Sequence, residues 1–388
     1  MLYFDYNATH PLSPAAREAW LRATRDFPGN PSSPHRLGAR ADEALNEARE
    51  KLAGWLGGAA ADLVWTSGAT EASNAAVHHA SRAGGGEAWI SAIEHPCVLA
   101  ATRRYFAGRQ QSMPVTRAGI VDLGWLADRL QHKRPALVCL MAANNETGVL
   151  QPWREALALC REHDVPFFCD AAQWIGKLPA TGLGACDLVS GCAHKFGGPQ
   201  GVGFLKVPAK FQALVVGGPQ EEGRRAGTEN VAGVLAMIAA LEYPEGRAPA
   251  GPHHSSPAGG IGAAGAEPSG RLAWRAGFER ALLVALPGAQ IVGSDADRLW
   301  NTVSAIMPEI PDCRQRWVVK LDKLGFAVST GSACASGKEE TSHVLAAMGF
   351  TSGEASRVLR LSSGWETRAG DWERLLGGLR SAHAALVP

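Results

Sequence analysis

The feature that most constrains the fold is an alternation of helical stretches with short apolar runs, from about residue 15 to residue 241. This pattern is typical of a mainly parallel sheet covered by helices, and so predicts an α/β fold. The runs expected to form strands are 62–66, 88–91, 136–141, 166–170, 188–190 and 202–206. Several end at polar residues. Because open α/β sheets bind ligands beyond the carboxyl ends of their strands, we expect the site there.

A segment rich in Gly, Pro and Ala interrupts this alternation between residues 244 and 270, where the chain reads PEGRAPAGPHHSSPAGGIGAAGAEPSG. It has neither a helical nor a strand period, and therefore predicts a flexible linker. The chain length suits about two to three domains. We expect a large domain over residues 15–243 and a smaller α+β domain formed by residues 1–14 and 271–388.

The charge of the chain favours small molecules or proteins as partners. Lys and Arg number 38 against 37 for Asp and Glu, which leaves no electrostatic footprint for nucleic acid or an anionic membrane. The longest apolar stretch, 231–241, is shorter than the ~20 residues that span a bilayer. The start of the chain lacks a basic leader followed by an apolar core. These features predict a cytoplasmic protein with no membrane segment.

The eight cysteines are too sparse and too irregularly spaced for a disulfide scaffold, so most should be reduced and buried. Cys186, Cys192 and His194 lie close enough in sequence to raise the question of zinc. The chain has no CxxC element there and no second pair of ligands at finger-like spacing. We therefore expect no metal site.

The first candidate site is the stretch WTSGATEASNAAVHHA over residues 65–80, where an apolar run enters a helix-forming segment. Such a turn presents backbone N–H groups and hydroxyls at a helix N-terminus, which suits a phosphate group. The same sequence is equally typical of an ordinary helix N-terminus, with Ser67 or Thr70 as the capping residue. The segment alone leaves both interpretations open.

The second is PFFCDAAQ over residues 166–173, which delivers Asp170 at the end of an apolar run and Gln173 three residues later. A carboxylate at that position can hold a protonated ring nitrogen. An Asp that caps a helix is the more ordinary interpretation of this segment taken alone.

The third is SGCAHKFGGPQGVGF over residues 190–204, which places Lys195 before four glycines. A lysine in a glycine-rich turn allows close approach of a ligand, and a desolvated amine can form a Schiff base. A solvated turn lysine is the alternative.

The fourth is STGSACASGKEETSHVLAAMG over residues 329–349, which sets Cys334 among Gly, Ser and Ala on an expected loop. A nucleophilic thiol needs exposure and reach, whereas a structural cysteine is buried among large apolar neighbours. These surroundings favour a functional Cys334.

In chain order, these segments resemble the cysteine desulfurases, in the class V aminotransferase group of fold type I pyridoxal-phosphate enzymes. The resemblance covers nearly the whole chain, through the motifs FDYNATHPL, NPSSPHRLG, TSGATE, EHPCV, ANNETGVLQP, CDAAQWIGK, AHKFGGPQG, RRAGTENVAG, GSACASG and RLSSG. ANNETG and GSACASG favour a desulfurase over other class V members, and the loop resembles the longer of two subgroup types. The resemblance implies a fold type I PLP-dependent transferase, with a mainly parallel seven-stranded sheet and a smaller C-terminal domain that carries the cysteine loop.

The resemblance also implies residue roles around pyridoxal 5'-phosphate. Lys195 would hold the cofactor covalently and later move the α-proton of the substrate. Asp170 would pair with the pyridinium nitrogen, which keeps the ring an electron sink. His95 would stack on the ring and assist proton transfer, and Gln173 would hydrogen-bond the phenolic oxygen. Cys334 would receive the sulfur.

The remaining roles concern the phosphate and the substrate. The residues that match the phosphate cradle are Ala69, Thr70, His194 and, from the other subunit, Thr228. Asn145 would lie beside the ring and the substrate. Arg360 would clamp the substrate carboxylate, a planar task that suits a guanidinium fork.

The chain departs from the family pattern in three places. Cys192 stands in the cradle where a Ser is usual, so one phosphate hydrogen bond is weakened. His10 stands where a second Thr is usual. The segment 244–270 replaces a charged helix that joins the domains in relatives; a true linker and an altered reading frame both fit it. We expect the active site to survive and the domain connection to loosen.

The resemblance implies that L-cysteine is converted to L-alanine and that its sulfur passes to Cys334 as a persulfide, in a homodimer that uses Thr228. A protein acceptor would then take the sulfur for iron–sulfur cluster assembly or tRNA thiolation. Cys334 is also a candidate transient ligand of an iron–sulfur cluster. Two alternatives stay open. One is a selenocysteine lyase or another class V enzyme, and the other is a non-catalytic partner in sulfur trafficking.

Overall fold

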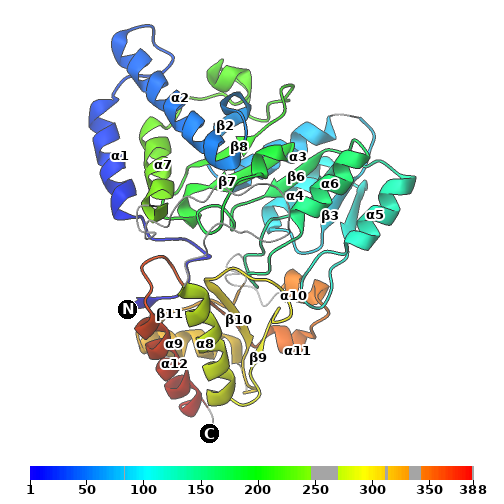
Figure 1. The fold of residues 1–388 in the computed structure, drawn as a ribbon, viewed down its shortest axis with the longest axis vertical. Helices are drawn as coiled ribbons and strands as arrows, with labels where there is room; N and C mark the ends of the chain where they lie inside the picture. Colours follow the sequence, from blue (N-terminus) through cyan, green and yellow to red (C-terminus); the bar gives the residue numbers. More distant parts are fainter. Residues whose placement is uncertain (83, 246–269, 311–312, 332–341, 387–388) are drawn as a thin grey trace, which may run out of the picture.

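The computed structural model describes residues 1–82, 84–245, 270–310, 313–331 and 342–386. A larger part contains a seven-stranded sheet, and a smaller part contains most of the C-terminal elements (Figure 1). The N-terminal strand and the last helix, α12, both lie in the smaller part (Figure 1).

The large sheet has the strand order β2-β8-β7-β6-β5-β3-β4. Its strands are β2 (Leu63–Thr66), β3 (Ala88–Ser91), β4 (Gln110–Met113), β5 (Leu137–Cys139), β6 (Phe167–Asp170), β7 (Leu188–Cys192) and β8 (Gly203–Lys206). The strands from β4 to β7 run parallel, whereas β8 pairs antiparallel with both β7 and β2. The prediction of a mainly parallel seven-stranded sheet is confirmed.

Both faces of this sheet are buried, and its residues alternate between two cores because the side chains of a strand repeat with period 2. Trp65, Val138 and Phe167 belong to one core, and their neighbours Val64 and Leu137 belong to the other. The first face is covered by α1 (Pro14–Asp26), α2 (Arg36–Leu56), α5 (Leu123–His132), α6 (Trp153–Glu162) and α7 (Val231–Glu245). The second is covered by α3 (Ala69–Ser81) and α4 (Pro96–Tyr105).

Three strands differ from the sequence prediction by two residues or more, and one of them is β5, which ends at Cys139 rather than at residue 141. β4 was not among the expected strands because its sequence, QQSM, is mostly polar and only Met113 is fully buried. It lies at the sheet edge, where β3 supplies its hydrogen bonds. β7 runs two residues beyond the expected end at residue 190, so it carries Cys192 directly to the site edge. The short 3₁₀ helices are η1 (Ala60–Asp62), η2 (Leu183–Ala185), η3 (Ala193–Lys195) and η4 (Gln220–Gly223).

The smaller part has an antiparallel sheet of order β12-β10-β9 and its own hydrophobic core. The strands are β9 (Gln290–Ile291), β10 (Thr302–Ile306) and β12 (Val358–Ser362). The helices are α8 (Arg271–Ala285), α9 (Cys313–Lys323), α10 (His343–Ala347), α11 (Ser352–Ala355) and α12 (Ala369–Ala384). Strand β1 (Leu2–Tyr3) pairs in parallel with β11 (Phe326–Ala327), and Phe4 packs edge-on against Trp372 at 5.0 Å. These contacts support our proposal that residues 1–14 belong to the smaller domain.

The predicted linker lies mostly outside the described residues. Helix α7 ends at Glu245, two residues beyond the expected boundary at residue 243, and residues 246–269 are not described. No helix within the described ranges is long and apolar enough to cross a membrane.

Candidate active site

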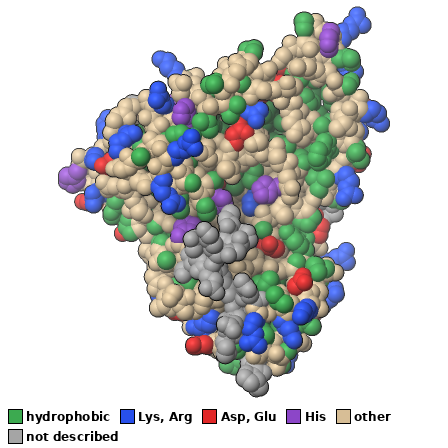
Figure 2. Space-filling view, turned by 180° about the vertical axis from the view of Figure 1, so that it is seen from behind, with side chains coloured by type: hydrophobic (Ala, Val, Ile, Leu, Met, Phe, Trp, Pro, Cys, Tyr) green, Lys and Arg blue, Asp and Glu red, His purple; other side chains and the backbone are tan. Residues whose placement is uncertain are grey.

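A cavity of about 870 Å³ lies beyond the carboxyl ends of β6 and β7 and reaches residues of the smaller part. The predicted site residues that line it are Ala69, Thr70, His95, Asn145, Asp170, Gln173, Cys192, His194, Lys195 and Arg360. Thr228 is exposed and is not among the lining residues of the same chain. Cys334 lies outside the described residues. Figure 2 shows histidine side chains gathered midway down the molecule, where the two parts meet.

Asp170 is the last residue of β6 and is almost fully buried. Its Oδ1 accepts hydrogen bonds from the backbone N–H of Ala172 at 3.0 Å and from the Ser190 hydroxyl at 3.2 Å. The residues that follow form turns rather than a helix, so the helix-capping interpretation is wrong. The carboxylate is held rigidly at the cavity wall by two donors.

Lys195 ends η3, directly after β7, and its side chain enters the cavity. Its Nζ donates to the backbone oxygens of Asn7 at 2.7 Å and Ala8 at 2.9 Å. Burial lowers the pKa of Lys195, and the positive charge of Arg360 lowers it further. A lowered pKa leaves more of the amine neutral and nucleophilic at neutral pH. The solvated turn lysine is therefore excluded.

His95 is the N-cap residue of α4, and its ring lies in the cavity wall. The backbone N–H of Cys97 donates to its Nδ1 at 3.2 Å, and the Cys97 thiol lies 3.0 Å from the same nitrogen. Burial lowers the pKa of His95, although the nearby Asp170 carboxylate raises it. A neutral ring whose Nδ1 accepts must carry its proton on Nε2. His95 is thus held ready to donate from Nε2.

The N-terminus of α3 opens into the cavity without a side-chain cap. Its N-cap is Gly68, at φ +149°, and neither Ser67 nor Thr70 caps the helix, so the ordinary capping interpretation is wrong. A Cβ on Gly203 would lie 2.6 Å from the Cα of Gly68, so the glycine lets β8 approach this turn closely. An uncapped helix N-terminus favours an anion through its free N–H groups and its dipole.

Cys192 and His194 line the same cavity. A backbone hydrogen bond from Ala69 reaches the Cys192 sulfur, but burial dominates and raises the pKa of the thiol to about 11. The Nδ1 of His194 lies 3.2 Å from the Thr9 hydroxyl, and burial lowers the pKa of the ring to about 4. Both groups are therefore neutral at pH 7. Among the described residues, no group of three His, Cys, Asp or Glu side chains could hold a metal ion.

The sequence matches the class-V aminotransferase family model over residues 2–250. It is 36% identical to a cysteine desulfurase of Enterobacter agglomerans over 380 residues, covering 95% of this chain and 88% of that protein. It is 35% identical to a cysteine desulfurase of Rhodobacter capsulatus, covering all of this chain and 97% of that one. The chain belongs to the cysteine desulfurase family.

Solved structures share its fold. A NifS-like protein from Rickettsia africae superposes with a TM-score of 0.84 at 26% identity, covering 99% of each chain. SspA in complex with cysteine superposes with a TM-score of 0.77 at 28% identity, covering 93% of this chain and 98% of that one.

Members of the cysteine desulfurase family are pyridoxal 5'-phosphate enzymes, and the cavity fits this cofactor. The open N-terminus of α3 offers N–H donors for the phosphate. The buried carboxylate of Asp170 and the amine of Lys195, whose pKa is lowered, line the same cavity. The first would face a ring nitrogen and the second would hold the aldehyde carbon. A single cavity thus contains a phosphate site, an acidic partner and a nucleophilic amine.

Arg360 lies on β12 with its side chain 1% exposed, yet it lines the cavity. Its guanidinium donates to Asp5 Oδ1 at 2.7 Å and to the backbone oxygens of Asn145 at 3.0 Å and Gly331 at 2.9 Å. The guanidinium is therefore already hydrogen-bonded to three oxygens of the protein. A substrate carboxylate would have to displace or share one of these acceptors.

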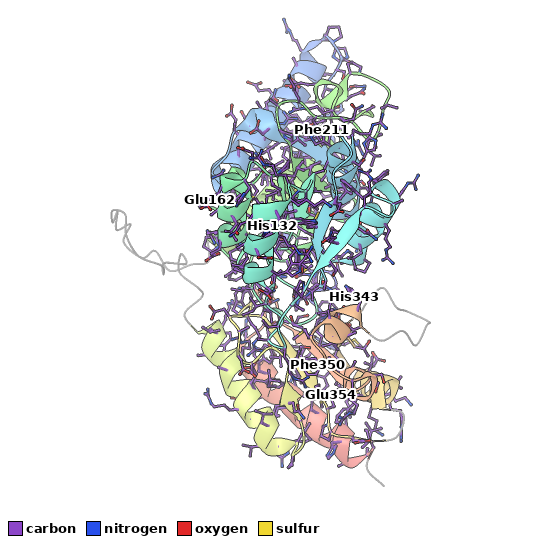
Figure 3. The ribbon with its side chains drawn as sticks, turned by 90° about the vertical axis from the view of Figure 1, so that its right-hand side faces the viewer. His132, Glu162, Phe211, His343, Phe350 and Glu354 are labelled. Atoms are coloured by element: carbon purple, nitrogen blue, oxygen red, sulfur yellow. The ribbon has the colours of Figure 1, made fainter. Side chains whose placement is uncertain are left out.

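The sequence did not single out several residues of the cavity wall. Asn7 lies in the quoted motif FDYNATHPL, but only its contacts reveal its place under Lys195. Ser342 donates to Glu146 Oε2 at 2.6 Å, and His343 Nε2 lies 2.8 Å from the Glu94 backbone oxygen. Figure 3 shows His343 on the side of the smaller part that faces the larger part, with Phe350 and Glu354 farther from it.

His10, the second departure from the family pattern, lies outside the cavity lining. It is buried against the Tyr6 ring, with Nε2 3.5 Å from Glu366 and Nδ1 2.7 Å from the Pro11 backbone oxygen. Its role is to pack the N-terminal segment.

Proposed function

We propose that this protein is a cysteine desulfurase that converts L-cysteine to L-alanine and transfers the sulfur to Cys334. The C–S bond of cysteine breaks and an S–S bond forms on Cys334, so the thiol becomes a persulfide and the substrate leaves as alanine. The observation that carries the proposal is the convergence of Lys195, Asp170 and the open N-terminus of α3 in one cavity. The SspA structure, which contains cysteine, supports this amino acid as the substrate.

When bound, pyridoxal 5'-phosphate supplies an electron sink next to the α-carbon of the substrate. Asp170 would hold the ring nitrogen in its protonated form, and two donors keep its carboxylate in place for that role. Lys195 would anchor the cofactor and would then move the α-proton of the substrate, a role that its lowered pKa suits. His95 would assist proton transfer by donating the proton on its Nε2. Arg360 would bind the carboxylate of the substrate.

We further propose that the enzyme is a cytoplasmic homodimer. The exposure of Thr228 supports its assignment to the phosphate site of the partner subunit. The persulfide then passes to a protein acceptor, either an iron–sulfur scaffold or a tRNA-thiolation relay.

The decisive experiment replaces Cys334 by Ala. The variant keeps every residue assigned to the cofactor, so the absorbance band of bound cofactor and the binding of cysteine should persist. Formation of alanine and of protein-bound persulfide from cysteine should stop, because the attacking thiolate is gone. Mass spectrometry of the protein and an amino-acid assay measure the two products.

Cys139 and Cys169 provide matched controls, because both are fully buried in the sheet. Their replacement by Ala should lower the melting temperature and leave sulfur transfer intact. Alanine release from cysteine at the wild-type rate by the Cys334→Ala variant would replace the persulfide mechanism with a lyase or aminotransferase activity. A wild-type protein without a cofactor band would support the non-catalytic alternative.

A further inference from the structure

Lys177 is a buried lysine that lies next to the site without lining the cavity. It is 6% exposed and follows β6 in the run of turns that begins after Asp170. Its Nζ donates to the side-chain oxygen of Gln173, and to Asn7 Oδ1 at 3.3 Å.

The side chains around Lys177 do not neutralise a positive charge on its amine. Among the described residues, no carboxylate forms an ion pair with it. Burial lowers the pKa of Lys177 well below its usual value, the positive charges of Lys195 and Arg360 lower it further, and Cys192 raises it. Lys177 in turn helps to lower the pKa of the His10 and His194 rings. Burying an amine without a counterion is costly, so the contacts it makes must matter.

Those contacts fix the orientation of the Gln173 amide. The amide oxygen accepts from Lys177, and the amide nitrogen donates to the Asn7 backbone oxygen at 2.9 Å. Rotating the amide by 180° would place its oxygen against the Asn7 oxygen and would remove the acceptor of the Lys177 N–H. Both ends of the amide therefore select the same orientation, which leaves the second N–H of the nitrogen free for the cavity.

We propose that Lys177 is a positioning residue that holds the Gln173 amide so that its free N–H donates to the phenolic oxygen of the cofactor. This inference rests on the proposed roles of Gln173 and Lys195. Lys177 acts on the cofactor through Gln173 and has no contact with the substrate.

The test is a pH titration of the visible absorbance of the holoenzyme in a double-mutant cycle. Lys177→Met releases the amide, and the phenolic oxygen loses a donor that favours its deprotonated form. The midpoint of the absorbance change should therefore rise by about one pH unit, the size expected for one hydrogen bond to a charged group. In a Gln173→Leu background the same change should add little, because the amide through which Lys177 acts is absent.

Lys206→Met is the matched control, since the Lys206 amine is also largely buried and donates to the Cys186 backbone oxygen at 2.7 Å. It should leave the midpoint unchanged even where it lowers the melting temperature. If Lys177→Met does not fold, Lys177→Gln is taken through the same cycle and should shift the midpoint in the same direction. An unchanged midpoint, or an equal shift with and without Gln173, would overturn the inference. A wild-type protein with no cofactor band would instead overturn the proposed function.

Discussion

Replacing Cys192 by Ser should tighten cofactor binding. The side chain ends β7 at the phosphate end of the cavity, it is 2% exposed, and the N–H of Ala69 points at its sulfur. The sulfur therefore already faces the helix terminus that we assign to the phosphate. With its pKa raised to about 11, the thiol is protonated at neutral pH and is only a weak donor.

The expected gain follows from the strength of the new hydrogen bond. A hydroxyl that donates to a charged acceptor contributes about 1.5 to 3 kcal/mol. At about 1.4 kcal/mol for each factor of ten, this is roughly a tenfold to hundredfold decrease in Kd. The thiol already supplies a weak contact, and the hydroxyl in the cofactor-free protein is paired with water. We therefore expect the lower end, about tenfold.

The assay is a titration of cofactor-free protein with pyridoxal 5'-phosphate, followed by the absorbance of the bound form. Cys186→Ser is the control, because Cys186 is equally buried in the large core but does not line the cavity. Its Kd should equal that of the wild type. The same Kd for Cys192→Ser and the wild type would refute the placement of Cys192 at the phosphate, and equal tightening in both variants would show an unspecific effect.

Three further variants test the assigned groups. Lys195→Ala should abolish both the cofactor band and turnover, and retention of the two would show that another lysine holds the cofactor. Asp170→Asn should keep the melting temperature near that of the wild type and slow turnover by at least a hundredfold, roughly the effect of losing a well-placed charged partner; normal turnover would remove Asp170 from its role. Glu94→Gln should flatten the pH dependence of stability. Burial raises the pKa of Glu94, so the folded state keeps a proton that the unfolded chain releases above about pH 4.5. Wild-type stability should therefore fall by up to about 1.4 kcal/mol per pH unit from there to the folded pKa, as measured by melting temperature.

Much of the sheet and of the site could be predicted from the sequence because the information is local. Buried strands appear as short apolar runs, Asp170 is the last residue of its strand, and Lys195 ends the short helix that follows its strand. The carboxyl ends of parallel neighbours lie at one edge, so residues at the ends of β6 and β7 must meet there. Strand β4 was not predicted because an edge strand can be polar and is stabilised by hydrogen bonds to a single neighbouring strand.

The contacts beneath the cofactor could not be predicted because they join residues far apart in sequence. Lys177 stands in the motif CDAAQWIGK, where turn residues carry no period that shows which side chains face inward. Its burial appears only when Asn7 and Gln173 are placed around it. The contacts of Arg360 could not be predicted either. Its motif predicted a clamp for the substrate carboxylate, but not the hydrogen bond that its guanidinium donates to Asp5.

Asn7 connects the two parts of the molecule at the site. Its backbone N–H donates to Ser362 and its side chain to Thr302, both in the smaller sheet. Its backbone oxygen accepts from Lys195 and Gln173, both in the larger part. One residue thus connects the two sheets directly under the reactive amine. The N-terminal segment makes this connection, so it couples the position of Lys195 to the smaller sheet.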